Sequence, residues 1–171
     1  NGTNGIDVSE TFDWQSDFDV VTGNGDNGVE VGSTLTLVAD SLEVVGNFTN
    51  GIVATGSNSD VTLYQCNLHQ NTIGDGIRLS GGNNTMDIDY SFIRDNGDDG
   101  IDTGGSNTLE LDNSLIGYNG SYGIRSSGSV DINYSDVLHN GSVGISTSQF
   151  STVDNSIVWF NGGVPQMTTS N

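Results

Sequence analysis

Carboxylates recur in this sequence at intervals that could bring them together in space. Asp87, Glu110 and Asp131 lie 23 and 21 residues apart, and Asp89 and Asp112 are likewise 23 residues apart. If each interval is one turn of a repeating structure, these five side chains form two neighbouring rows. Carboxylate oxygens suit Ca²⁺, which accepts carboxylates, carbonyls and water in flexible geometry. The candidate Ca²⁺ ligands are therefore Asp87, Asp89, Glu110, Asp112 and Asp131, together with Asp98 in the turn 95–99.

A solvated acidic surface is the other interpretation of these rows, and it is the default because charged rows usually face solvent. Carboxylates on rungs ~4.8 Å apart repel by about 0.9 kcal/mol even at the dielectric constant of water. Concentrated salt shortens the Debye length to a few Å and screens that repulsion. The rows would then mark a protein from seawater or brine rather than a metal site.

The arginines are spaced in the same way. Arg78, Asp102 and Arg125 lie 24 and 23 residues apart, so they are expected on successive rungs as an ion-pair ladder. Cross-strand pairs of opposite charge contribute roughly 0.2–1 kcal/mol each.

The element that must position these side chains is a repeat of 21 to 25 residues, which is typical of a solenoid. An Asn recurs through the chain, and a Gly-aliphatic pair follows each one. The Asn residues are Asn1, Asn24, Asn47, Asn71, Asn96, Asn119, Asn140 and Asn161. The pairs are Gly5-Ile6, Gly28-Val29, Gly51-Ile52, Gly76-Ile77, Gly100-Ile101, Gly123-Ile124, Gly144-Ile145 and Gly163-Val164.

Apolar residues within each repeat alternate with period two, as in Met86 with Ile88 and Leu109 with Leu111. This pattern predicts short strands with one face inward. Such strands bury a core only when successive coils stack. The predicted fold is all-β: a parallel β-helix of about seven coils, with three short strands per coil.

Residues at one equivalent position of successive repeats are called a column here, and two such columns are expected to have a structural role. The repeat Asn residues are expected to hydrogen-bond along the axis as a ladder and to satisfy turn backbone groups. Five residues before each Asn is a column of mostly small residues, including Ser91, Ser114 and Cys66. This column is predicted to face inward, with Cys66 as a buried, inert thiol.

The repeat covers residues 1–171 as a single domain, interpreted as a segment of a larger protein. Residues 1–22 fit the repeat poorly around Phe12, Trp14 and Phe18, and are expected to form an irregular first coil or a cap. Residues 153–171 are expected to form the last coil. Open solenoid ends favour end-to-end self-association.

Charge excludes two classes of partner. The chain has 3 cationic residues against 22 carboxylates, and its formal net charge is −19. Such a surface repels phosphate backbones and anionic lipid, so nucleic acid and membrane surfaces are not expected partners. Membrane insertion is also not expected, because no apolar run approaches the ~20 residues of a membrane helix.

Triangular coils of this length with an Asn at one corner resemble the right-handed parallel β-helix of the pectate-lyase superfold. Enzymes of that superfold combine Ca²⁺-binding Asp with a basic Arg. The resemblance therefore implies, as an alternative function, a polyuronate lyase or hydrolase with Asp99, Asp102, Arg78 and Arg125 near its site. Gly97-Asp98-Asp99 also resembles a phrase of polygalacturonases, but the companion phrases of those enzymes and the longer lyase signatures are absent.

The phrase Val153-Asp154-Asn155-Ser156-Ile157-Val158-Trp159-Phe160-Asn161 resembles the closing repeat of bacterial surface proteins that carry a choice-of-anchor domain. The resemblance implies a secreted, cell-surface segment with an anchoring signal beyond Asn171. The favoured function is a non-catalytic extracellular or cell-surface module. It would act as a rigid spacer, or as an adhesion or carbohydrate-contacting segment, with a polysaccharide or cell-surface ligand as its partner and Ca²⁺ as its candidate cofactor.

Overall fold

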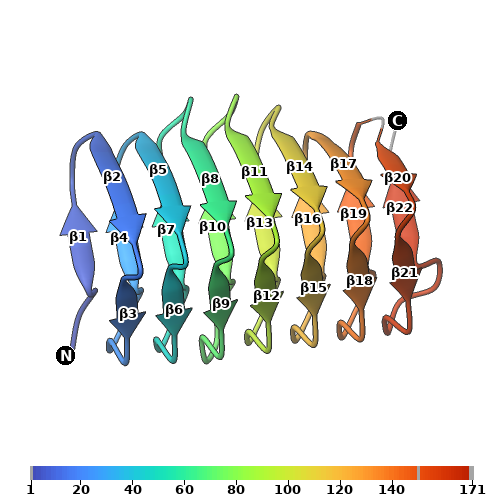
Figure 1. The fold of residues 1–171 in the computed structure, drawn as a ribbon, viewed down its shortest axis with the longest axis horizontal. Coiled ribbons are helices and arrows are strands. Elements are labelled where there is room, and N and C mark those ends of the chain that lie inside the picture. The colour runs from blue at the N-terminus through green and yellow to red at the C-terminus, as the bar shows by residue number, and fades with distance from the viewer. Residues whose placement is uncertain (1, 150, 170–171) are drawn as a thin grey trace.

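The computed structural model describes residues 2–149 and 151–169 as a straight stack of parallel β-coils, shown in Figure 1. Each coil contributes one strand to each of three sheets, called A, B and C here, and every strand pairs with the equivalent strands of the neighbouring coils. The prediction of a right-handed parallel solenoid of about seven coils is confirmed. The described residues form no helix that is long and apolar enough to cross a membrane.

The strands are short. Sheet A contains β1 (Ile6–Val8), β4 (Val29–Val31), β7 (Ile52–Ala54), β10 (Ile77–Leu79), β13 (Ile101–Thr103), β16 (Ile124–Ser126), β19 (Ile145–Thr147) and β22 (Met167–Thr169). Sheet B contains β2 (Phe12–Asp17), β5 (Leu35–Asp40), β8 (Asp60–Tyr64), β11 (Thr85–Asp89), β14 (Thr108–Asp112), β17 (Ser129–Asn133) and β20 (Thr152–Asp154). Sheet C contains β3 (Val20–Thr22), β6 (Glu43–Val45), β9 (Asn67–His69), β12 (Phe92–Arg94), β15 (Leu115–Gly117), β18 (Asp136–Leu138) and β21 (Ile157–Trp159). Coils are numbered here from coil 1 (β1 to β3) to coil 7 (β19 to β21).

Aliphatic side chains from all three sheets fill the interior. In coil 4 these are Ile77, Leu79, Met86, Ile88 and Ile93, each at most 1% exposed. Burial of one such side chain stabilises the fold by about 1.5–3 kcal/mol. The core forms only because the coils stack, since a single coil would leave both sides of these residues in water.

The predicted Asn ladder is confirmed. Asn96 donates its backbone N–H and its side-chain amide to Asn119 Oδ1, at 3.1 and 3.0 Å, and a second amide bond reaches the carbonyl oxygen of Leu68. The same pattern joins Asn47, Asn71, Asn119 and Asn140 to their successors. At Asn161 the acceptor is Gln166 Oε1, which receives the backbone N–H at 2.8 Å and the amide at 3.1 Å. Gln166 therefore takes the place that the Asn of a further coil would occupy.

The small column also faces inward, as predicted. Ser91, Ser114 and Ser135 are buried, and each hydroxyl oxygen accepts the backbone N–H of the preceding residue in the column. Cys66 N, Ser91 N and Ser114 N lie 2.9, 2.9 and 3.0 Å from these oxygens. Burial raises the pKa of the Cys66 thiol, which agrees with an inert side chain.

The Gly of each Gly-aliphatic pair is required by close backbone approach. A Cβ added at Gly100 would lie 2.6 Å from the carbonyl oxygen of Gly123 and 2.8 Å from Ile116 Cγ2. Among the described glycines, positive φ angles occur at Gly23, Gly46 and Gly105, which are not members of these pairs. The paired glycines are therefore required by close packing and not by a left-handed backbone.

The two ends differ from the sequence expectation in detail. Residues 6–22 form a regular coil in register with coil 2, with Phe12 opposite Leu35. Phe12 and Trp14 pack against the core because their spacing keeps the period-two pattern. In the last repeat, Gly163-Val164 does not begin a strand of sheet A. Met167 pairs with Ile145 instead, because a loop around Val164-Pro165 lengthens this turn.

Candidate functional site

The acidic rows of sheet B form as the sequence spacing predicts. Asp87 pairs with Glu110 and Asp89 with Asp112, and Glu110 pairs in turn with Asp131. All five side chains are exposed or half-buried on the outer face of the sheet. Partial burial and the charges of Asp89, Asp112 and Asp60 raise the pKa of Asp87. Their role as metal ligands stays a prediction.

A second buried ladder, which sequence reasoning missed, runs along the turn that enters sheet A. It consists of the residues directly before the Gly of each pair. Asn50 donates its backbone N–H and its amide to Asn27 Oδ1, at 3.1 and 2.8 Å. Asp75 N lies 2.7 Å from Asn50 Oδ1, and Asp99 N lies 2.9 Å from Asp75 Oδ1. Two rungs of an amide ladder are therefore carboxylates.

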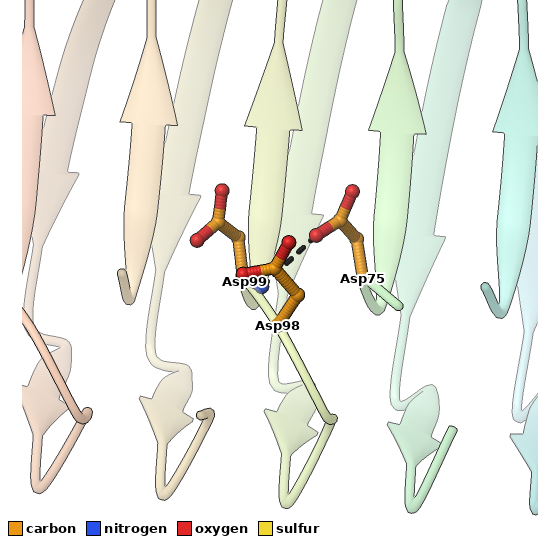
Figure 2. A group of neighbouring side chains, drawn as sticks. All are labelled: Asp75, Asp98 and Asp99. Carbon is orange, nitrogen blue, oxygen red and sulfur yellow. Dashed lines mark hydrogen bonds between the residues drawn. The ribbon is translucent and has the colours of Figure 1, made fainter. Parts of the chain in front are cut away.

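These two rungs form a cluster with Asp98, drawn in Figure 2. One oxygen from each of Asp75, Asp98 and Asp99 lies within 4.8 Å of the others. Among the described residues, no other three carboxylate, His or Cys side chains meet this condition, so the rows of sheet B do not. Asp75 and Asp99 are 1% and 0% exposed, whereas Asp98 is exposed. Figure 2 shows the Asp75 and Asp99 side chains on adjacent coils and Asp98 in the turn between them.

Burial dominates the ionisation of both inner carboxyls. Burial raises the pKa of Asp75 to about 7. The hydrogen bond from the backbone N–H of Asp99 opposes this increase because it favours the charged carboxylate, and the negative charges of Asp99, Asp102 and Asp98 add to the increase. Burial likewise raises the pKa of Asp99, while the N–H of Tyr122 and the charge of Arg125 act in the opposite direction.

Arginine neutralises part of this cluster. Arg125 Nη2 lies 2.9 Å from Asp99 Oδ2 and 2.9 Å from Asp102 Oδ2, and the contact to Asp99 is an ion pair without hydrogen-bond geometry. Arg78 Nε lies 3.8 Å from Asp102 Oδ2. The register of Arg78, Asp102 and Arg125 on successive rungs is as predicted. The four residues of the alternative enzyme site therefore lie together, beside Asp75.

The cluster can hold a cation better than it can perform acid–base catalysis. The oxygens of Asp75, Asp98 and Asp99 suit Ca²⁺, although Arg125 already neutralises Asp99 and Asp75 is partly protonated near pH 7. A general acid must come within hydrogen-bond distance of its substrate. Asp75 and Asp99 are buried and hold backbone N–H groups, so neither can do so without disrupting the ladder.

Exposed aromatic side chains form a second candidate surface, on the outer face of sheet C and at its corner. Tyr118, His139 and Phe160 precede the ladder Asn of coils 5, 6 and 7, and their rings stack in parallel with centroids 4.9 and 5.4 Å apart. We call these three residues the aromatic column. Trp159 contacts Phe160 edge to face at 5.7 Å.

The turn that holds the aromatic column has a left-handed residue in every coil. The three residues of the aromatic column have φ angles of 55–58°, and the same station holds Gly23 and Gly46 in coils 1 and 2 and Gln70 and Asp95 in coils 3 and 4, at φ angles of 55–65°. A left-handed conformation costs a non-Gly residue roughly 1–2 kcal/mol, or about 3–6 kcal/mol for three. Two stacked pairs return about 1–3 kcal/mol. Phe160 is 69% exposed, so burial contributes little. Because Gln70 and Asp95 adopt the same conformation, this strain belongs to the turn, and the feature that distinguishes the aromatic column is its exposed, stacked rings.

Comparison with known proteins identifies one family. The family model described as "Right handed beta helix region" matches residues 39–171, which is most of the chain. The chain has no significant match among curated proteins or among solved structures.

Proposed function

The chain belongs to the family of right-handed β-helix regions, and we propose that it is a non-catalytic, rigid module of an extracellular or cell-surface protein that contacts carbohydrate. Fold alone does not decide this, because solenoids of one architecture serve many functions. The proposal rests on the chemistry of the carboxylate cluster and on the exposed surfaces.

The observation that carries the proposal is the burial of Asp75 and Asp99, which raises the pKa of both carboxyl groups. Asp75 and Asp99 are rungs of an internal ladder and cannot approach a sugar. Asp102 is more accessible, but Arg125 and Arg78 both neutralise it. The site thus supports a structural use of these groups. A surface location is suggested by the resemblance of the segment around Trp159 to the closing repeats of bacterial surface proteins.

Ca²⁺ stabilisation is part of the proposal, and Asp98 allows it to be tested. Thermal unfolding is measured in chelator, in CaCl₂ and in NaCl of matched ionic strength. A bound ligand stabilises by RT ln(1 + [L]/Kd), so a specific site responds to Ca²⁺ beyond the matched salt. We expect that response in the wild type and in Asp112→Asn, and its loss in Asp98→Asn.

The other outcomes are equally informative. Loss of the response in Asp112→Asn instead would assign Ca²⁺ to the rows of sheet B. Equal stabilisation by NaCl would mean that the acidic groups are only a screened surface, and it would remove Ca²⁺ from the proposal.

A polyuronate lyase or hydrolase is the alternative, favoured by the contacts that join Asp99, Asp102, Arg78 and Arg125. The test is incubation with pectate, alginate and chondroitin, following ultraviolet absorbance for unsaturated products and reducing ends for hydrolysis. We expect neither signal. Activity that disappears in a folded Asp102→Asn variant would overturn the non-catalytic proposal.

A further inference from the structure

Sheet C has an unusual outer face in the C-terminal half of the solenoid. Its strands carry outward-facing apolar side chains over four successive coils: Phe92, Leu115, Leu138, Ile157 and Trp159. Phe92, Ile157 and Trp159 are 49%, 55% and 57% exposed. Figure 1 shows the corresponding strands β12, β15, β18 and β21 side by side. We call these five residues, with the aromatic column, the sheet C patch.

The patch is local rather than a property of the repeat. In coils 2 and 3 the same stations hold Glu43, Val45, Asn67 and His69, of which Val45 alone is apolar. Contiguous exposed apolar surface of this kind marks an interaction site. The aromatic column adds three stacked rings to this surface in coils 5, 6 and 7, at a station that Gly23, Gly46, Gln70 and Asp95 fill in coils 1 to 4.

We propose that the sheet C patch binds a neutral polysaccharide, with the sugar chain lying along the solenoid axis; this inference rests on the proposed carbohydrate contact and names its surface and ligand. Pyranose rings with equatorial linkages, as in β-1,4-linked glucans, expose flat C–H faces that pack against aromatic and aliphatic side chains. Four coils at ~4.8 Å per rung provide an elongated strip of roughly 14 Å between the first and last rung. The strip therefore suits an extended chain rather than a compact ligand.

The charge of the protein favours a neutral ligand for the sheet C patch. The protein has a net charge of −19, whereas the charged groups among the outer residues of sheet C in coils 4 to 7 are Arg94 and Asp136. A polyuronate or a second copy of the chain would bring further negative charge to this surface. A neutral glycan brings none, and Asp136 beside the apolar residues can accept hydrogen bonds from its hydroxyl groups.

The test is affinity electrophoresis in gels that contain hydroxyethyl cellulose, a neutral β-1,4-linked glucan. Gels with dextran, which is neutral but α-linked, and with pectate, which is anionic, serve as ligand controls. We expect the hydroxyethyl cellulose gel to retard the wild-type chain in chelator, and the dextran and pectate gels not to do so.

Phe160→Gly is the decisive variant, because Gly adopts the backbone conformation of Phe160 without strain. It should remain folded and lose affinity about tenfold or more, as should Trp159→Ala. Phe18→Gly is the matched control. Phe18 is 75% exposed and has a φ of 57°, but it lies in coil 1, outside the patch. Its substitution should leave retardation unchanged.

Three results would overturn the inference. One is the absence of retardation by hydroxyethyl cellulose. Another is an equal loss in Phe18→Gly and Phe160→Gly. The third is a wild-type dimer in sedimentation that Phe160→Gly dissociates, since a second copy would then be the occupant. Retardation in pectate only when Ca²⁺ is present would retain the proposed carbohydrate contact but move it away from sheet C.

Discussion

Replacing Asp75 by Asn should stabilise the protein at neutral and alkaline pH. Asp75 is a buried acid in a ladder that Asn27 and Asn50 begin as amides. An Asn at position 75 would still accept the N–H of Asp99. Its amide could also donate to Asn50 Oδ1, as Asn50 donates to Asn27 Oδ1 at 2.8 Å.

The magnitude follows from the pKa of Asp75, which is about 7 in the folded protein against 3.8 for an unperturbed Asp side chain. Each pKa unit corresponds to about 1.4 kcal/mol, so ionised Asp75 costs about 4 kcal/mol of folding free energy above pH 7. Between these two pKa values the folded state keeps a proton that the unfolded state has lost. The free energy of unfolding of the wild type therefore falls as pH rises from about 4 to 7.

The assay is thermal unfolding in chelator, followed by circular dichroism. At about pH 8, a gain of about 4 kcal/mol should raise Tm by roughly 8–16 °C in Asp75→Asn. At about pH 5 the gain should fall below about 2 kcal/mol, because folded Asp75 then retains its proton. Asp7→Asn, which removes one exposed carboxylate of sheet A, should give no comparable pH-dependent gain.

Two results would refute this reasoning. One is a wild-type stability that stays level or rises between about pH 4 and 7, because the cost of ionising Asp75 would then be negligible. The other is an Asp75→Asn variant that is less stable than the wild type at about pH 8. That outcome would mean that the negative charge itself, rather than the shape and hydrogen bonds of the side chain, holds the ladder together.

Three further substitutions test other parts of the rod. Asn119→Leu should lower stability by about 1–3 kcal/mol for each buried donor left without an acceptor, since Asn96 donates two hydrogen bonds to Asn119; an unchanged denaturant midpoint would argue against the ladder. Ser114→Arg should prevent folding, because Ser114 is 6% exposed in the inward column and a buried unpaired charge is strongly unfavourable; a soluble variant with wild-type circular dichroism would be inconsistent with that placement. Arg125→Gln should destabilise the protein at about pH 8 by more than at about pH 5, because Arg125 lowers the cost of ionising buried Asp99; equal losses at both pH values would show that the ion pair is unimportant.

The fold could be predicted from the sequence because residues of the same chemical type recur at the positions that determine it. Each coil places aliphatic residues at the same stations, and the register of Asp87 with Glu110 follows directly from that spacing. The Asn and Ser columns were visible for the same reason. The Gly163-Val164 pair repeats the motif but does not begin a strand, because a longer turn places Met167 opposite Ile145 instead.

The carboxylate cluster was only partly predictable. Asp99, Asp102, Arg78 and Arg125 could be grouped from their spacing, but the burial of Asp75 could not be foreseen. The column before the paired Gly changes from Asn to Asp and then to Tyr122 and Val143, so no single residue type reveals it. An Asp in an acidic sequence is expected to face solvent, whereas Asp75 is 1% exposed and its Oδ1 accepts a hydrogen bond from Asp99 N.

Gln166 makes the last rung of the Asn ladder different from the rungs before it. Inside the stack, each added coil supplies fresh acceptors for the coil before it, so elongation at a ladder end satisfies donors that would otherwise be unpaired. At Gln166 those donors are already satisfied, and its own amide is held by the carbonyl oxygens of Asn161 and Gly163. Gln166 thereby closes the Asn ladder from within the same chain, using a side chain one methylene longer than the Asn that closes every earlier rung.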